Sequence, residues 1–141
     1  MASGKTHDRA SKWVAIAAGS IVGSLCVDND QLVVLATVTT LVTWAWGLFL
    51  SPDLDLAESP RGCNAKRRWG LLSAYWVPYG KAFKHRGMSH WLIVGTATRL
   101  VYGLWPLVLW AWETGSMEIV WFVFACGCVS DATHLVLDYW G

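Results

Sequence analysis

Long apolar blocks separated by short polar connections dominate this sequence. Residues 32–50 carry no charged side chain, and a second apolar run from residue 91 to 112 is interrupted only by Arg99. Because a membrane-spanning helix needs about 20 apolar residues, with a range of roughly 17 to 25, blocks of this length predict spans. The pattern predicts four transmembrane helices, over about residues 10–27, 32–50, 90–112 and 119–139.

The first block is the shortest of the four, and two other interpretations apply to it. A cleaved signal peptide would have the same basic flank and apolar length, and a buried core helix would have the same composition. The stretch "GSLCV" offers no small-x-small cleavage site, because Leu25 stands where a small residue is needed. We therefore favour a span for residues 10–27.

Composition and charge distribution agree with a membrane protein. Of the 141 residues, 55% are hydrophobic and 15% are charged, whereas about a quarter are charged in ordinary soluble domains. Ten of the eleven basic residues lie before Trp13 or in the connection 51–89, and the other two connections, "DND" and "ETGSME", carry only acidic charges. Since short basic loops stay in the cytoplasm, both termini and the long loop are expected there, in a bacterial inner membrane.

Within the long connection, residues 69–83 are apolar but too short to span a bilayer. With Pro78 and Gly80 breaking the pattern, the stretch is typical of a helix that lies in the membrane interface. The predicted fold is all-α: one integral membrane domain over residues 1–141, a bundle of four transmembrane helices with a short interfacial helix in the cytoplasmic loop 51–89. The basic residues form no nucleic-acid recognition motif, so no nucleic acid is expected as a partner.

The unusual polar residues of the chain all fall on the cytoplasmic side of this topology. They include all four histidines and lie at the ends of the predicted helices. They are His7, Asp8, Asp53, Asp55, His85, His90, Asp131, His134 and Asp138.

Local spacing suggests that several of these side chains act together. Asp131, His134 and Asp138 follow the i, i+3, i+7 rule, so they share one helix face within about 60°. After Pro52 the chain is expected to be extended, and Asp53 and Asp55 would then point the same way. Ser89 is expected to cap the third helix, which would place His90 in its first turn.

Imidazole together with carboxylate is a ligand set for divalent transition metals, zinc above all, with manganese or iron as alternatives. Nine candidates exceed the ligands of one ion, so some would orient a ligand or two ions would share the site. An equally good role for Asp8 is to stabilise the helix dipole from the first turn of the first helix, facing solvent. Asp131 is a candidate ligand, but it lies at a depth similar to that of Arg99, and a buried ion pair between them is favoured. The four cysteines are too dispersed to form a thiolate site.

The motifs "THD", "SPDLD", "WVPYGKAFKHRGMSH" and "SDATHLVLDYW" resemble a family of small, mostly uncharacterised membrane proteins described as metal-binding. The order of these motifs is also similar to that of membrane-bound metal-dependent hydrolases. The resemblance covers nearly the whole chain, and "HRGMSH" is its most specific element. It implies metal contact by a set of seven residues, namely His7, Asp53, Asp55, His85, His90, His134 and Asp138.

A metal of this kind would activate water against a phosphoryl or carbonyl group. Asp53 or Asp55 would accept the proton, and Arg86, between His85 and His90, would pair with a phosphate oxygen. We therefore expect hydrolysis of a phosphoester or lipid headgroup, with an anionic or phosphorylated substrate and the lipid bilayer as partner. The alternative is a non-enzymatic scaffold, stabilised by metal, in a homo-oligomer or a membrane complex.

Overall fold

The computed structural model describes residues 4–25, 31–56, 64–83 and 87–140. Helices make up nearly all of these residues, and no β-strand occurs among them, which confirms the all-helical prediction. The long helices are α1 (Gly4–Leu25), α2 (Gln31–Phe49), α5 (Leu92–Gly103), α6 (Trp105–Thr114) and α7 (Met117–Trp140).

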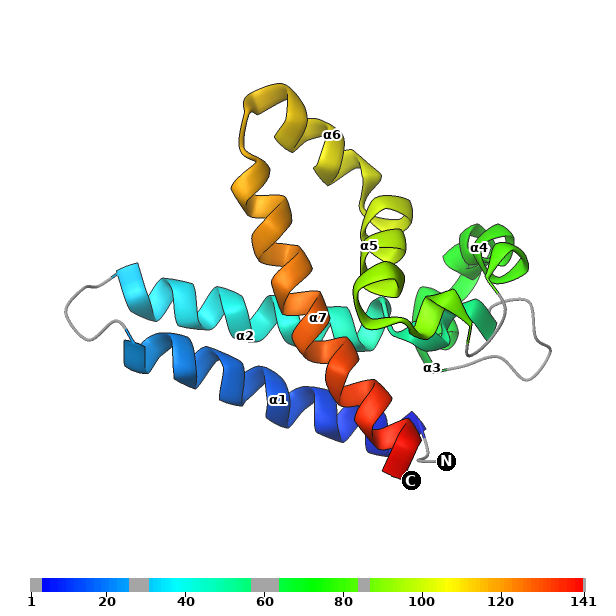
Figure 1. Cartoon of the computed structure of the whole chain (residues 1–141), viewed down its shortest axis with the longest axis horizontal. Coiled ribbons are helices and arrows are strands. Elements are labelled where there is room, and N and C mark those ends of the chain that lie inside the picture. The colour runs from blue at the N-terminus through cyan, green and yellow to red at the C-terminus, as the bar shows by residue number, and fades with distance from the viewer. Residues whose placement is uncertain (1–3, 26–30, 57–63, 84–86, 141) are drawn as a thin grey trace.

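Helices α1, α2 and α7 meet at one end of the molecule. Helices α1 and α2 run antiparallel and side by side, and α7 crosses both of them (Figure 1). The end of α7 comes back to the beginning of α1, so that the two termini lie close together (Figure 1). Gly47 of α2 sits at this crossing, where a Cβ would clash with the hydroxyls of Ser11 and Ser130. A small residue is therefore needed for the three helices to approach each other.

In the described part of the chain, two segments are long and apolar enough to cross a membrane, Leu32–Leu56 and Met117–Trp140. The predicted helix over 90–112 is instead two helices, α5 and α6, bent by 83° at Leu104, with Pro106 in the first turn of α6. Counted as one broken span, this pair raises the number to three. Helix α1 does not qualify: charged residues occupy its first turns and leave the stretch 13–25, roughly 20 Å of helix, as its apolar part.

The connection between α2 and α5 is built from short helical pieces. They are the 3₁₀ helix η1 (Pro52–Leu56), α3 (Asn64–Trp69), the 3₁₀ helix η2 (Gly70–Trp76), α4 (Val77–Ala82) and the 3₁₀ turn η3 (Met88–His90). The predicted interfacial helix over 69–83 is thus interrupted, because Gly70 adopts a positive φ of 53° and Pro78 starts a new helix. Trp76 and Tyr79 fix this region to the core beside Leu54 and Leu100.

Two local predictions were wrong. Residues after Pro52 are not extended but form η1, so Asp53 and Asp55 point in different directions, since each residue of a 3₁₀ helix turns by about 120°. Ser89 does not cap the third helix: α5 begins with Trp91 at its N-cap and without a side-chain cap. A Cβ at Gly95 would overlap the carbonyl oxygen of Ser89, so the turn η3 packs directly on α5.

Candidate metal centre

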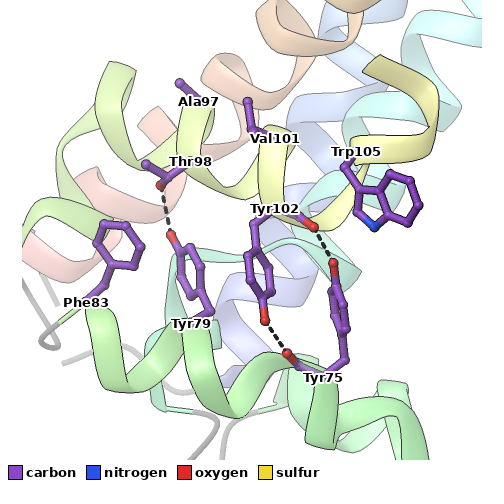
Figure 2. Close-up of a pocket in the computed structure, with 8 residues that line it drawn as sticks. All are labelled: Tyr75, Tyr79, Phe83, Ala97, Thr98, Val101, Tyr102 and Trp105. Atoms are coloured by element: carbon purple, nitrogen blue, oxygen red, sulfur yellow. Dashed lines mark hydrogen bonds between the residues drawn. The ribbon is translucent and has the colours of Figure 1, made fainter. Parts of the chain in front are cut away.

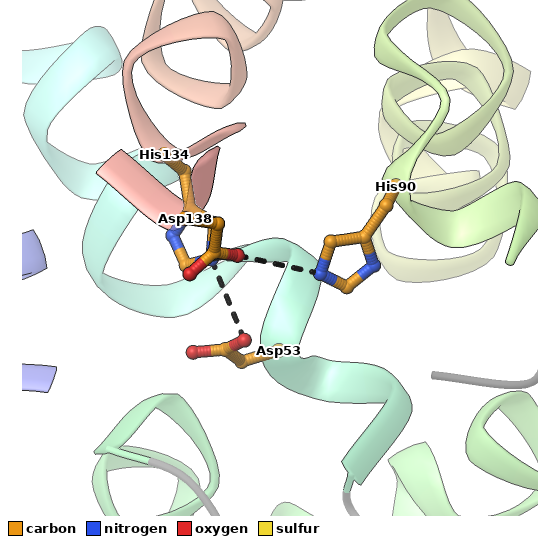
Figure 3. A group of neighbouring side chains, drawn as sticks. All are labelled: Asp53, His90, His134 and Asp138. Atoms are coloured by element: carbon orange, nitrogen blue, oxygen red, sulfur yellow. Dashed lines mark ion pairs between the residues drawn. The ribbon is translucent and has the colours of Figure 1, made fainter. Parts of the chain in front are cut away.

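Four side chains from three segments converge where the helix ends meet. Asp53 comes from η1, His90 from η3, and His134 and Asp138 from the last turns of α7 (Figure 3). Each offers one ligand atom, and these atoms all lie within 4.8 Å of one another. We call these residues the four-residue centre.

The distances inside the centre are longer than those of ordinary hydrogen bonds and suit a shared cation. His134 Nε2 lies 3.4 Å from Asp138 Oδ2 and 3.4 Å from Asp53 Oδ1. Hydrogen bonds between nitrogen and oxygen are about 2.7–3.2 Å long, and this buried nitrogen has no hydrogen-bond partner in the described part of the chain. Two atoms that each lie roughly 2.0–2.2 Å from one ion at the tetrahedral angle are about 3.3–3.6 Å apart. The residues present therefore fit a divalent metal.

A carboxylate outside the four-residue centre, that of Asp55, lies next to the Nδ1 side of the His90 ring. Its Nδ1 lies 3.3 Å from Asp55 Oδ2, and its Nε2 lies 3.8 Å from Asp138 Oδ2. The Asp55 side chain is fully buried, and Ser89 Oγ donates a hydrogen bond of 2.5 Å to the same Oδ2. Histidine ligands commonly donate their other ring N–H to a carboxylate, which fixes the tautomer and the ring orientation. Asp55 is thus placed to orient a ligand.

His7 adjoins the centre on its other side. Its Nε2 lies 3.3 Å from Asp138 Oδ1, and its ring stacks on that of His134 with centroids 4.0 Å apart. His7 Nδ1 is buried and has no hydrogen-bond partner among the described residues. Asp138 therefore has one histidine near Oδ1 and two near Oδ2, an arrangement that has ligand atoms for one ion or for two.

Asp131 belongs to a separate network. Arg99 Nη2 donates to Asp131 Oδ2 at 2.5 Å, and both side chains are 1% exposed. Thr96 Oγ1 donates to the same oxygen, and Trp46 Nε1 donates to Asp131 Oδ1 at 3.2 Å. We call Trp46, Thr96, Arg99 and Asp131 the Arg99 network. The buried ion pair that the sequence favoured is present, and the structure does not bring Asp131 into the four-residue centre.

The two groups are connected through Ser89. Arg99 Nη1 donates a hydrogen bond of 2.7 Å to the backbone carbonyl of Ser89, whose side chain donates to Asp55. The Arg99 network therefore holds the turn that carries His90. Sequence reasoning missed these roles of Ser89 and Trp46, although Ser89 lies in the "HRGMSH" motif, where a polar side chain next to a ligand was a signal.

Asp8 pairs with the basic surface rather than with the centre. Its Oδ2 accepts hydrogen bonds from Arg68 Nη2 at 2.6 Å and from Asn64 Nδ2 at 3.3 Å. This contact ties α1 to α3. The remaining predicted site residues, His85 and Arg86, lie outside the described residues.

A small polar cavity lies beside the centre. Its volume is about 10 Å³, and its lining includes His7, Ser51, Asp53 and Arg68. This is about the space that one water molecule occupies. Asp53 is the most exposed member of the four-residue centre, with 26% of its side chain accessible, compared with 8% for each of the two histidines. Water can therefore reach the centre at the Asp53 carboxylate.

Comparison with known proteins supports metal binding. A family model described as uncharacterised metal-binding protein (DUF2227) matches residues 2–140. An uncharacterised protein from Aquifex aeolicus (strain VF5) is 41% identical over 54 residues, which are 38% of this chain and 36% of that protein. The chain thus matches about a third of the relative's length. No solved structure matches the chain significantly.

Proposed function

The chain belongs to the uncharacterised metal-binding protein family DUF2227, and from this premise we propose that it is a membrane-embedded, metal-dependent hydrolase of phosphoesters. The observation that carries the proposal is the four-residue centre, where the buried Nε2 atoms of His90 and His134 converge with the carboxylates of Asp53 and Asp138 next to a water-sized cavity. Two imidazoles and two carboxylates suit zinc, with manganese or iron as alternatives. One ion would be held by His90, His134 and Asp138, with Asp53 beside its open position, and a second would draw on His7 and Asp138.

A divalent ion bound there would lower the pKa of a water molecule and polarise a phosphoryl oxygen. Asp53 is the residue that we assign to accept the water's proton, because it is the most accessible carboxylate of the centre and lines the cavity. Asp55, buried against Ser89, keeps the Nε2 of His90 directed at the centre. The expected pairing of Arg86 with a phosphate oxygen stays a prediction.

The membrane setting is supported by the surfaces of the long helices. Large apolar side chains on α1, α2 and α7 are exposed, among them Trp13 at 65%, Val33 at 72% and Trp121 at 65%. Exposed apolar surface of this extent is typical of a lipid-facing surface. The centre would then lie at the cytoplasmic end, because the polar residues gather at the end that also carries the basic segment α3.

The burial of the two histidines favours a second candidate, a structural metal site. An ion held by residues of η1, η3 and α7 would fasten three segments together without any reaction, as closed sites do. Such a scaffold would serve a homo-oligomer or a larger membrane complex. An exchangeable coordination position separates the two candidates, because only the catalytic site has one.

Elemental mass spectrometry on the detergent-purified chain tests the centre. We expect roughly one or two transition-metal ions per chain in the wild type and a loss of most of them in His134→Ala and Asp138→Asn. Asp8→Asn is the matched control, because Asp8 is a carboxylate near the centre that pairs with Arg68 instead. Equal metal content in all variants, or a metal-free wild type after loading, would refute the site.

Hydrolysis is tested on the metal-loaded wild type with soluble and lipid phosphoesters. We expect metal-dependent release of phosphate or headgroup that Asp53→Asn reduces by roughly 10²-fold or more while metal stays bound. A chain that holds its metal tightly and hydrolyses none of these substrates would favour the scaffold.

A further inference from the structure

An apolar groove lies between the segment of η2 and α4 on one side and α5 on the other. It has a volume of about 660 Å³, within the usual range of roughly 300–1,000 Å³ for ligand pockets. Its walls include Tyr75, Tyr79 and Phe83 on one side and Val101, Tyr102 and Trp105 on the other (Figure 2). At 100° per residue, Ala97 and Val101 lie about 160° from Arg99 around α5, whereas Tyr102 lies only about 60° from it. The groove and the Arg99 network therefore use adjoining faces of the same helix.

The groove presents aromatic rings and no unsatisfied hydroxyl. Tyr75 Oη donates to the carbonyl of Tyr102 at 2.5 Å, and Tyr102 Oη donates to the carbonyl of Tyr75 at 2.6 Å. Tyr79 Oη and Thr98 Oγ1 share a hydrogen bond of 3.0 Å. The rings of Phe83, Tyr79, Tyr102 and Tyr75 form a continuous row, with successive centroids 4.6, 5.4 and 4.8 Å apart. Because its tyrosine hydroxyls bond within the protein, the groove fits an apolar, elongated occupant.

The segment before the groove indicates where such an occupant comes from. Helix α3 carries Lys66, Arg67 and Arg68, and Leu71 and Leu72 follow in η2 with 98% and 67% of their surfaces exposed. Basic side chains next to exposed leucines are typical of a segment that lies on an anionic bilayer surface. The charge of α3 would concentrate anionic lipids near this segment, and the groove lining begins six residues after α3, at Tyr75.

The groove also leads towards the metal centre. Phe83 lines both the groove and a neighbouring hollow of about 340 Å³, which Gly87 and Met88 line as well. Met88 is the first residue of η3, the turn that ends at His90. The Phe83 end of the groove is therefore the end nearer in the chain to the turn that carries His90.

We propose that this groove binds an acyl chain of an anionic phospholipid taken from the bilayer. The chain lies along the row of aromatic rings, and the phosphate lies towards η3. The assignment of this lipid as the substrate rests on the proposed hydrolase function, whereas the binding of its acyl chain does not.

Photolabelling tests the groove directly. The full chain would be reconstituted in bilayers of phosphatidylcholine that contain phosphatidylglycerol with a diazirine at the end of one acyl chain, irradiated, and digested for peptide mapping. We expect adducts concentrated in peptides that cover 75–83 and 97–105. Val101→Trp, which fills the groove, should reduce these adducts roughly tenfold, the factor that corresponds to losing the burial of only two methylene groups.

Val34→Trp is the matched control, because Val34 is a valine of similar exposure, 63% compared with 57% for Val101, on α2 and away from the groove. It should leave the labelling unchanged. Adducts spread evenly over all exposed helices, or labelling that Val101→Trp does not reduce, would overturn the proposal. The same holds if Val101→Trp changes the oligomeric mass in detergent instead of the labelling, since the groove would then be an interface between copies.

Two further measurements separate the groove from the hydrolase. Asp138→Asn, without metal, should be labelled like the wild type, and loss of its labelling would contradict a groove that is independent of the centre. If the loaded wild type hydrolyses phosphoesters, Val101→Trp should lower kcat/KM for the lipid roughly tenfold and leave that for a soluble phosphoester unchanged. An equal loss for both substrates would contradict the groove as a lipid site, and absence of hydrolysis with normal labelling would contradict only the enzyme.

Discussion

The four-residue centre and the Arg99 network both include polar side chains of α7, and one turn of helix separates Asp131 from His134. In the Arg99 network, Asp131 accepts hydrogen bonds on both oxygens at 2.5–3.2 Å. In the four-residue centre, the closest polar atoms stay 3.4–3.8 Å apart. Protein atoms alone therefore satisfy both oxygens of Asp131, although Arg99 Nε has no hydrogen-bond partner among the described residues. The four-residue centre instead has a gap that a cation fits.

The largest effect is expected from removing Asp131 from the Arg99 network. Asp131→Ala leaves the Arg99 guanidinium buried without its acceptor, which should lower the free energy of unfolding by roughly 3–5 kcal/mol. Denaturation of the purified chain in mixed micelles measures this loss. The double variant Arg99→Met/Asp131→Leu should recover most of it, because an apolar pair of similar volume needs no partner. A single variant as stable as the wild type would show that the network is not the structural element described.

A smaller effect is expected from changing Asp55, which supports His90 of the four-residue centre. Asp55→Asn keeps an acceptor for Ser89 but presents an amide to His90 Nδ1, which favours the wrong tautomer. Metal affinity should fall roughly 10–100-fold, with little change in the stability of the metal-free chain. Competition with a fluorescent chelator measures the affinity. Complete loss of metal instead would make Asp55 a ligand.

The smallest effect is expected at the partly exposed pair of Asp8 and Arg68. Asp8→Asn weakens a pair with Arg68 in which both side chains are 27% exposed, and such pairs contribute at most about 1 kcal/mol. Metal affinity should stay unchanged, and the unfolding midpoint should shift only slightly. A loss of metal as large as that of Asp138→Asn would place Asp8 within the centre.

Sequence reasoning included Asp53, His90, His134 and Asp138 among its candidates because helix ends with histidine and aspartate were confined to one face of the predicted topology. It could not separate ligands from supports: Asp53 and Asp55 looked equivalent, and only the 3₁₀ turn η1 sends one to His134 and the other to Ser89. The predicted third helix over 90–112 had no charge pattern that revealed the bend at Leu104, although Pro106 was a signal.

The sequence by itself determined the helical class and the end of the molecule where the polar residues gather, because apolar length and charge placement are local properties of the chain. The tertiary structure decided which polar atoms face each other. Asp131 and His134 are three residues apart, yet α5 and α2 supply Arg99, Thr96 and Trp46 to the first, and η1 supplies Asp53 to the second. Whether a buried carboxylate is satisfied by the protein or fits a metal depends on the neighbours that packing brings within a few ångströms, and these come from distant parts of the chain.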